Sequence, residues 1–150
     1  MQDKLEYSWE DFDNDVQRIR LLLSVDNWLP DYIVGVKRGG LIPAIKLSHM
    51  LNKPMIMMSC QLRDSNIDDI KLLEAESLPK NQNILVVDDI CDSGITLSKI
   101  VIEFLNQGFF SIKTAALFYN TSQTFYVDYY SRFIDRSIDD RWIAFPWESK

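Results

Sequence analysis

The stretch of sequence that most constrains the fold is ILVVDDICDSGIT, at residues 84–96. Four apolar residues run directly into two adjacent aspartates, and a third, Asp92, precedes a turn of small residues. A short apolar run bounded by turn-forming residues is typical of a buried strand. A helical pattern follows over residues 93–107, and Gly108 is a typical helix stop. The stretch therefore predicts a strand, a tight polar loop and a helix in direct succession.

The same alternation of strand and helix runs through most of the chain. The pattern SWED from Ser8 resembles a capping box at the start of a helix. Residues 61–82 are polar and are expected to be irregular. We expect helices at residues 9–25, 41–52 and 93–107, and strands at residues 32–36, 54–60, 83–88, 111–119 and 125–130. Together they predict one α/β domain over residues 1–150, with a mainly parallel central sheet flanked by helices.

The composition excludes several classes of function. The chain has 150 residues and a formal net charge of −6, which argues against nonspecific nucleic-acid binding. Its two cysteines, Cys60 and Cys91, have no disulfide-framework or zinc-site spacing. No apolar run approaches the roughly 20 residues that span a bilayer, and the acidic N-terminus is unlike a signal peptide. We therefore expect a cytoplasmic protein with no membrane span and no nucleic-acid partner.

Asp88 and Asp89 follow the apolar run directly. A single aspartate in such a place is commonly a turn former or a helix cap. Two adjacent carboxylates repel each other, and a fold tolerates them more easily when a cation or a set of hydroxyls is the partner. The pair therefore indicates either the vicinal hydroxyls of a ribose or a magnesium ion held partly through water.

The turn that follows lies where the helix is expected to begin. A helix N-terminus offers unpaired amides and a partial positive charge, and so binds phosphate without lysine. Gly94 allows close backbone approach, and Ser93 and Thr96 add hydroxyl donors. Asp92 or Ser93 acting simply as the helix cap is an alternative, and it is compatible with phosphate binding.

The loop matches neither the GxxxxGK[ST] nor the GxGxxG phosphate motif. It resembles the 5-phosphoribosyl 1-diphosphate (PRPP) signature of the type I phosphoribosyltransferases. In that signature an apolar strand is followed by two acidic residues, two variable positions, an acidic residue, Ser or Thr, Gly, any residue, and Ser or Thr. YSWEDF, VKRGGLIPA and RWIAFPWE make the chain most similar to the xanthine-guanine and related purine enzymes. The resemblance implies the type I fold, with a small flexible hood at residues 61–71.

The resemblance also implies a role for each residue of the donor site. The loop of Lys37, Arg38, Gly39 and Gly40 would hold the diphosphate, with a cis peptide expected between Lys37 and Arg38. The other donor-site residues are implied to act as follows: Asp88 and Asp89 bind the ribose hydroxyls and Mg²⁺, Asp92 is the general base, and Ser93, Gly94, Ile95 and Thr96 bind the 5′-phosphate.

The acceptor site is implied by the end of the chain. Trp142 would stack on the purine, and the backbone of Ile143 would face its edge. Asn120 stands where the purine enzymes carry a lysine, and its amide could read a carbonyl or an amino group. Lys113 lies too early in the strand to replace that lysine. The hood lacks the expected arginine, for which Arg63 or Lys71 could substitute.

The expected function is therefore purine salvage. The enzyme would make a nucleoside 5′-monophosphate and diphosphate from PRPP and guanine, xanthine or hypoxanthine, with Mg²⁺ as cofactor, as a homodimer or homotetramer. One alternative is a catalytically weak regulatory protein that binds PRPP or a nucleotide. Another is a transferase for a different base. Trp147 and Cys91 are expected to be packing residues.

Overall fold

The computed structural model describes residues 3–63, 66–70 and 75–148, and the statements below refer to those residues. The helices are α1 (Trp9–Val25), α2 (Leu41–Leu51) and α3 (Ile95–Asn106). The strands are β1 (Lys4–Glu6), β2 (Tyr32–Val36), β3 (Met55–Met58), β4 (Cys60–Arg63), β5 (Asn66–Ile70), β6 (Asn83–Cys91), β7 (Ser111–Asn120), β8 (Tyr129–Ile134) and β9 (Trp142–Ala144).

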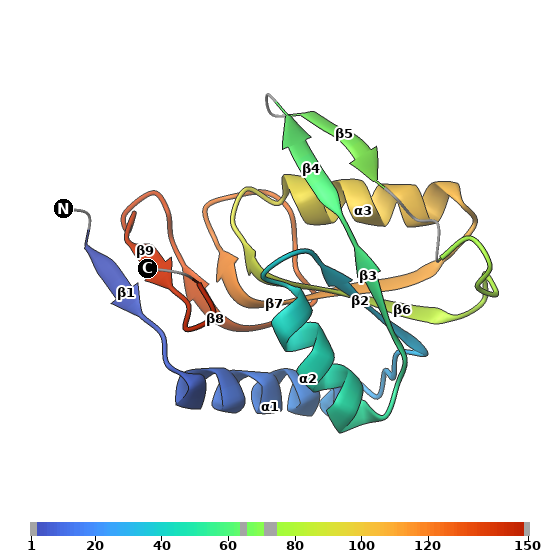
Figure 1. Cartoon of the computed structure of the whole chain (residues 1–150), viewed down its shortest axis with the longest axis horizontal. Helices are drawn as coiled ribbons and strands as arrows, with labels where there is room; N and C mark the ends of the chain where they lie inside the picture. The colour runs from blue at the N-terminus through green and yellow to red at the C-terminus, as the bar shows by residue number, and fades with distance from the viewer. Residues whose placement is uncertain (1–2, 64–65, 71–74, 149–150) are drawn as a thin grey trace.

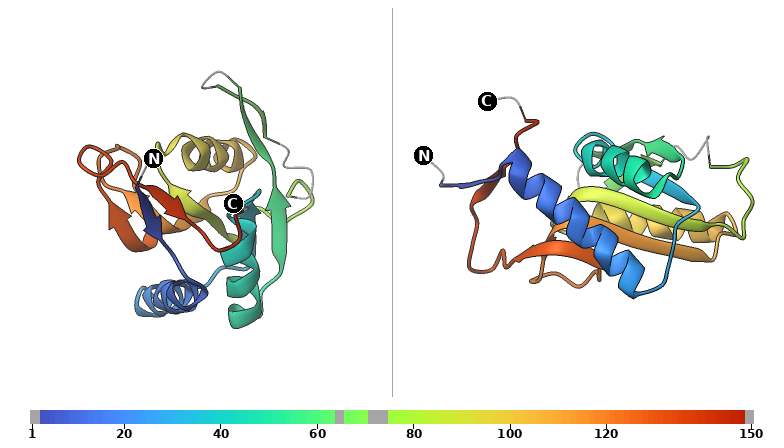
Figure 2. Two further views of the ribbon diagram at one scale, coloured as in Figure 1. Left: turned by 60° about the vertical axis from the view of Figure 1, so that its left-hand side comes forward. Right: turned by 90° about the horizontal axis from the view of Figure 1, so that it is seen from below.

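The centre of the molecule is a five-stranded sheet in the order β3-β2-β6-β7-β8. Every neighbouring pair in it is parallel. Helices α1 and α2 cover one face and α3 covers the other, so the fold has three layers (Figures 1 and 2). The predicted α/β fold with a parallel central sheet is confirmed.

Strand β6 explains why the sequence is continuously apolar before the aspartates. Successive side chains of a strand point to opposite faces, and both faces of this sheet are covered by helices. Leu85 and Val87 belong to the core beneath α1 and α2. Ile84 and Val86 belong to the core beneath α3. None of the four is exposed to solvent, so no position in the run could be polar without cost.

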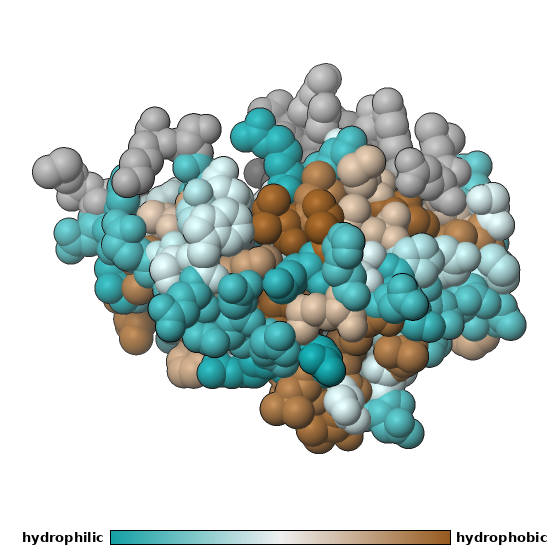
Figure 3. All heavy atoms as spheres, turned by 60° about the horizontal axis from the view of Figure 1, so that its bottom comes forward, coloured by the Kyte–Doolittle hydropathy of each residue, from teal (hydrophilic) through white to brown (hydrophobic). Residues whose placement is uncertain are grey.

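Helix α1 begins and ends where the sequence predicts. The Ser8 side chain accepts a hydrogen bond from the Asp11 backbone, and the Asp11 carboxylate accepts one from the Ser8 backbone, which completes the capping box. Val16 and Ile19 are buried in the core. The exposed face of the helix mixes polar residues with Leu21, Leu22 and Val25 near its end, and Figure 3 shows hydrophilic and hydrophobic side chains side by side on this side of the molecule.

Several boundaries differ from the expectation: the expected strand at residues 54–60 is divided between β3 and β4, and β8 ends at Ile134 instead of residue 130. Three further differences lie near the site. Strand β6 continues to Cys91, because its pairing with β7 persists to Tyr119, so the aspartate pair lies within the strand rather than after it. Helix α3 begins at Ile95, after Gly94. Strand β8 begins at Tyr129 instead of residue 125. The Asp128 carboxylate accepts hydrogen bonds from the backbone and hydroxyl of Thr114, which fixes the segment just before the strand.

Two small sheets were not predicted. Strand β1 pairs in parallel with β9, in the register Leu5 with Ile143. This sheet lies beside the carboxyl ends of β6, β7 and β8, at the end of the molecule where both termini lie (Figure 1). Strands β4 and β5 form an antiparallel pair that projects from the body of the fold, where an irregular segment was expected. Lys71 lies outside the described residues.

Candidate functional site

The loop between β2 and α2 lies directly against the end of β6. A Cβ atom added at Gly39 would overlap Oδ2 of Asp89 and lie 2.6 Å from its Cγ. A Cβ atom at Gly40 would lie 2.6 Å from the carbonyl oxygens of both Val36 and Val87. The two glycines therefore allow this loop to touch the aspartate-bearing strand. The peptide between Lys37 and Arg38 is cis, as the resemblance led us to expect.

Asp88 and Asp89 form a desolvated acidic pair. One Asp88 carboxylate oxygen accepts a hydrogen bond from the Asp89 amide at 2.9 Å, and an Asp89 oxygen accepts one from the Ile90 amide at 2.8 Å. Burial, reinforced by the charge of Asp89, raises the pKa of Asp88. Burial also raises the pKa of Asp89. Neither carboxylate forms an ion pair within the described chain, so the pair favours an external cation or proton.

This pair predicts a stability gain on neutralisation. A carboxyl whose pKa is raised by folding destabilises the fold as the pH rises above its ordinary value of 3.8 and through the folded value. We expect Asp88→Asn to raise the melting temperature at pH 8, by about 2–4 °C for each kcal/mol of cost removed. The gain should vanish below that ordinary value, where the unmodified carboxyl is also neutral.

Calorimetric melting temperatures measured from pH 3 to pH 8 check this expectation. Asp13→Asn is the control, because the Asp13 side chain on α1 is 63% exposed and forms only a surface ion pair with Lys46 at 3.6 Å, a kind of pair that contributes little to stability. It should change the melting temperature little at any pH. A lower melting temperature for Asp88→Asn than for wild type at pH 8 would contradict the expectation that the charged Asp88 carboxylate destabilises the fold.

The turn between β6 and α3 encloses a small cavity of about 160 Å³. The N-cap residue of α3 is Gly94, which has a φ of 81° and provides no side-chain hydrogen bond to the helix. Ser93 Oγ accepts a hydrogen bond from the Ile95 amide at 3.3 Å, whereas Asp92 is turned to other partners. The lining contains all the predicted phosphate residues except Ile95, and consists of Asp88, Ile90, Cys91, Asp92, Ser93, Gly94, Thr96 and Leu97.

The loop between β7 and β8 packs against this turn. A Cβ atom at Gly94 would lie 2.5 Å from Cβ of Phe125 and 2.7 Å from Oε1 of Gln123. The Gln123 amide nitrogen donates to the Phe125 carbonyl at 2.6 Å, which holds the loop in a closed shape. Gly94 is therefore required both by its positive φ and by this close approach. Nothing in the local sequence indicated that Gln123 and Phe125 would reach the turn.

Asn120 holds Asp92 in place. Its amide nitrogen donates to the Asp92 carbonyl at 2.9 Å and lies 3.4 Å from the Asp92 carboxylate. Its amide oxygen accepts from the backbone and hydroxyl of Ser122 and from the backbone of Arg136. With only 5% of its surface exposed, Asn120 has its amide committed within the protein. These hydrogen bonds direct the Asn120 amide toward Asp92, Ser122 and Arg136, and its predicted contact with a base stays a prediction.

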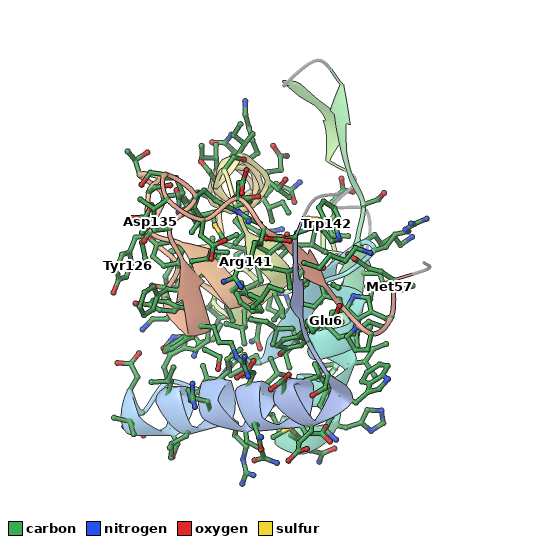
Figure 4. The ribbon with its side chains drawn as sticks, turned by 90° about the vertical axis from the view of Figure 1, so that its left-hand side faces the viewer. Glu6, Met57, Tyr126, Asp135, Arg141 and Trp142 are labelled. Atoms are coloured by element: carbon green, nitrogen blue, oxygen red, sulfur yellow. The ribbon has the colours of Figure 1, made fainter. Side chains whose placement is uncertain are left out.

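Arg136 is the residue of this region that the sequence did not single out. It follows β8, and its Nε lies 3.3 Å from a carboxylate oxygen of Asp92. Its Nη1 donates to the carbonyl of Arg141 at 2.6 Å, one residue before Trp142. The loop after β8 thus brings a cation to the end of β6, and Figure 4 shows Arg141 and Trp142 where the chain enters β9.

A larger cavity of about 660 Å³ joins the two ends of the predicted site. It is lined by Arg38, Gly39, Ile42, Asp89, Trp142, Trp147 and Glu148. The Trp142 ring is 54% exposed, and its Nε1 donates to Glu148 at 3.2 Å. Ile143 is buried, is paired with Leu5 of β1 and does not line this cavity, so its predicted contact with a base stays a prediction. Trp147 stacks on Phe145 with ring centroids 4.7 Å apart, so it packs as expected and also lines the cavity.

Three other predictions concern residues at or near the site. Lys37 and Arg38 are both exposed, and Arg38 faces the larger cavity. Lys113 is bound to Asp26 at 2.8 Å and is not available to the base, as predicted. Burial raises the pKa of the Cys91 thiol to about 12, which agrees with its predicted role as a filler. Side chains of the β4–β5 pair, Arg63 included, lie outside the description.

Comparison with known proteins identifies the family. The phosphoribosyl transferase domain family matches residues 8–150. The chain belongs to this family. A xanthine-guanine phosphoribosyltransferase of Cereibacter sphaeroides is 29% identical over 150 residues, covering 94% of this chain and 84% of that protein. The crystal structure of a purine phosphoribosyltransferase from Pyrococcus horikoshii is 30% identical, with a TM-score of 0.81 over 99% of this chain and 96% of that one.

A further structural neighbour supports the type I phosphoribosyltransferase fold. The xanthine-guanine-hypoxanthine phosphoribosyltransferase of Helicobacter pylori has a TM-score of 0.80 at 23% identity, covering 98% of this chain and 93% of that one. At that identity the likeness concerns the fold alone. Within the described part of this phosphoribosyltransferase chain, no helix combines the length and apolarity needed to cross a bilayer.

Proposed function

We propose that this protein is a purine phosphoribosyltransferase of the salvage type. It transfers the phosphoribosyl group of PRPP to a purine base, most favourably guanine, xanthine or hypoxanthine, and releases diphosphate. The observation that carries the proposal is the meeting of an acidic strand end, a helix N-terminus and an aromatic-lined cavity at one edge of a parallel sheet. Ligands of such sheets bind at this edge.

The donor is held by two loops that both adjoin the aspartate-bearing part of β6. The amides at the start of α3, with the hydroxyls of Ser93 and Thr96, bind the 5′-phosphate in the smaller cavity. Lys37, Arg38 and the backbone of Gly39 bind the diphosphate and neutralise its charge. Asp88 and Asp89 accept hydrogen bonds from the ribose hydroxyls between these two anion sites.

The acidic pair also fits Mg²⁺. Burial raises the pKa of both carboxyls, and no cation of the described chain pairs with either. The described residues contain no cluster of three or more carboxylate, histidine or cysteine ligands, so diphosphate oxygens and water must complete the coordination. Magnesium is commonly bound in this way, through one or two carboxylates and substrate phosphates. When bound, it supplies charge neutralisation of the leaving diphosphate.

The acceptor is bound in the larger cavity. Trp142 offers an exposed ring for stacking, and the backbone of Ile143 faces the edge of the base. Asp92 takes the proton that the purine loses as it becomes bonded to the ribose. Asn120 and Arg136 both donate toward the Asp92 carboxylate, which orients it for that transfer.

A panel assay tests the proposal. The protein is incubated with Mg²⁺, PRPP and, separately, guanine, xanthine, hypoxanthine, adenine and uracil, and diphosphate release is followed. We expect turnover with one or more 6-oxopurines and slower turnover with adenine and uracil. PRPP binding measured by calorimetry without turnover on any base would reject the enzyme and favour a regulatory binding protein. Sedimentation of the same sample tests the expected homodimer or homotetramer.

A further inference from the structure

Arg136 is fixed from three directions. Its backbone amide donates to the Asn120 side chain at 3.1 Å. Its Nη1 donates to the carbonyl of Arg141 at 2.6 Å and lies 3.5 Å from that of Asp139. Its side chain is 20% exposed, so it is largely enclosed but still reaches solvent. Such anchoring holds the guanidinium at one place and leaves part of it open to a ligand.

Arg136 joins the Asp92 carboxylate to the chain just before β9, although it is not among the residues that line either cavity. On one side Nε contacts the Asp92 carboxylate, whose side chain is 52% exposed. On the other side, Nη1 donates to the carbonyl of Arg141, the residue that precedes Trp142. These contacts use Nε and Nη1. A guanidinium carries five N–H donors in one rigid plane, so it can also donate to a ligand. A base positioned between Trp142 and Asp92 would therefore lie within reach of this group.

The chemistry of a purine gives this placement a consequence. A purine that reacts at N9 as its N7–H tautomer loses the N7 proton when the bond to ribose forms, and N7 and the 6-substituent lie on the same edge of the ring. A cation beside the proton acceptor therefore faces the 6-substituent. It can only donate hydrogen bonds, so it attracts a 6-oxo group and disfavours a 6-amino group.

We infer that Arg136 is the residue that selects 6-oxopurines over 6-aminopurines in this protein. The inference rests on the proposed function, because it takes Asp92 as the proton acceptor. A hydrogen bond from a charged donor corresponds to a preference of about 10- to 100-fold. Arg136 provides this preference from the loop between β8 and β9. The Asn120 side chain hydrogen-bonds to the backbones of both Asp92 and Arg136 and so fixes their relative position.

Equilibrium binding of two product nucleotides tests the inference without requiring turnover. Inosine 5′-monophosphate and adenosine 5′-monophosphate share the ribose and phosphate, so their affinity ratio reports the base alone. We expect wild-type protein to favour the inosine nucleotide by at least about 10-fold. Arg136→Met should abolish that preference, Arg136→Gln should behave similarly if the first variant unfolds, and Arg136→Lys should retain most of it.

Arg141→Met is the matched control. It removes the same charge from the same loop, where the Arg141 side chain pairs with Asp139 at 2.8 Å, and it should leave the affinity ratio unchanged. Melting temperatures verify that each variant is folded. An absent preference in wild type, or an unchanged ratio in Arg136→Met, would overturn the inference. Failure of turnover with every base, with the ratio still dependent on Arg136, would reject the proposed enzyme and leave this assignment standing.

Discussion

Asp92→Asn is expected to lower the turnover number by about 10²- to 10⁴-fold, the range typical of general acid–base catalysis. Asparagine has nearly the same shape and can still accept a hydrogen bond from Asn120, which lies 3.4 Å from the carboxylate. It cannot accept the proton of the incoming base. The main-chain carbonyl of Asp92, bound by Asn120 at 2.9 Å, is unchanged, so the phosphate turn should keep its form.

Steady-state kinetics and donor binding separate the two roles of this residue. We expect the dissociation constant of PRPP to change by less than the turnover number, because the proposed phosphate site at Gly94, Ser93 and the helix amides would be unchanged. Asp13→Asn, at an exposed position of α1, is the control for loss of one negative charge. Equal losses in donor affinity and turnover would mean that Asp92 binds the donor and does not transfer the proton.

Gly39→Ala is expected to reduce activity by at least about 10²-fold, since a displacement of about 1 Å in a reacting group can cost that much. The new methyl group would overlap Oδ2 of Asp89 and lie 2.6 Å from its Cγ. Either the carboxylate or the diphosphate loop must move. Both responses disturb the donor site, so the affinity for PRPP in the presence of Mg²⁺ should fall together with the turnover number.

A double-mutant cycle shows whether the overlap is the cause. Asp89→Ala removes the three side-chain atoms that the added methyl group would meet, namely Cγ and both carboxylate oxygens. The loss of melting temperature caused by Gly39→Ala should therefore be much smaller in the Asp89→Ala background than in wild type. An equal loss in both backgrounds would place the damage in the backbone of the loop instead.

The donor side of the candidate site was largely predictable from sequence because it is local. The apolar run, the aspartates and the glycine turn are contiguous, and the fold only had to bring residues 37–40 alongside them. The extra length of β6 was not predictable, because Asp88 and Asp89 have low strand propensity. It is the pairing with Ala116 and Phe118 on β7 that extends the strand past them.

The acceptor side depends on contacts between distant segments, which no local pattern records. Asn120 was assigned to the base by its position in the chain, whereas its amide is used to join Asp92, Ser122 and Arg136. Arg136 lies in a polar segment without periodicity, so its approach to Asp92 could be found only from the fold. Strands β1 and β9 have three residues each, too few for an alternating pattern to appear.

The pairing of β1 with β9 has a consequence for how the base preference could change by substitution. Within the described chain, β9 hydrogen-bonds to β1 alone among the strands, whereas both donor loops emerge from the five-stranded sheet. The backbone pairing of the segment that carries Trp142 is thus independent of the five-stranded sheet, although Ile143 and Phe145 pack into the core. Under the proposed function, exposed positions of this segment, such as Trp142, are where substitutions would change the accepted base without altering the sheet from which the proposed donor loops emerge.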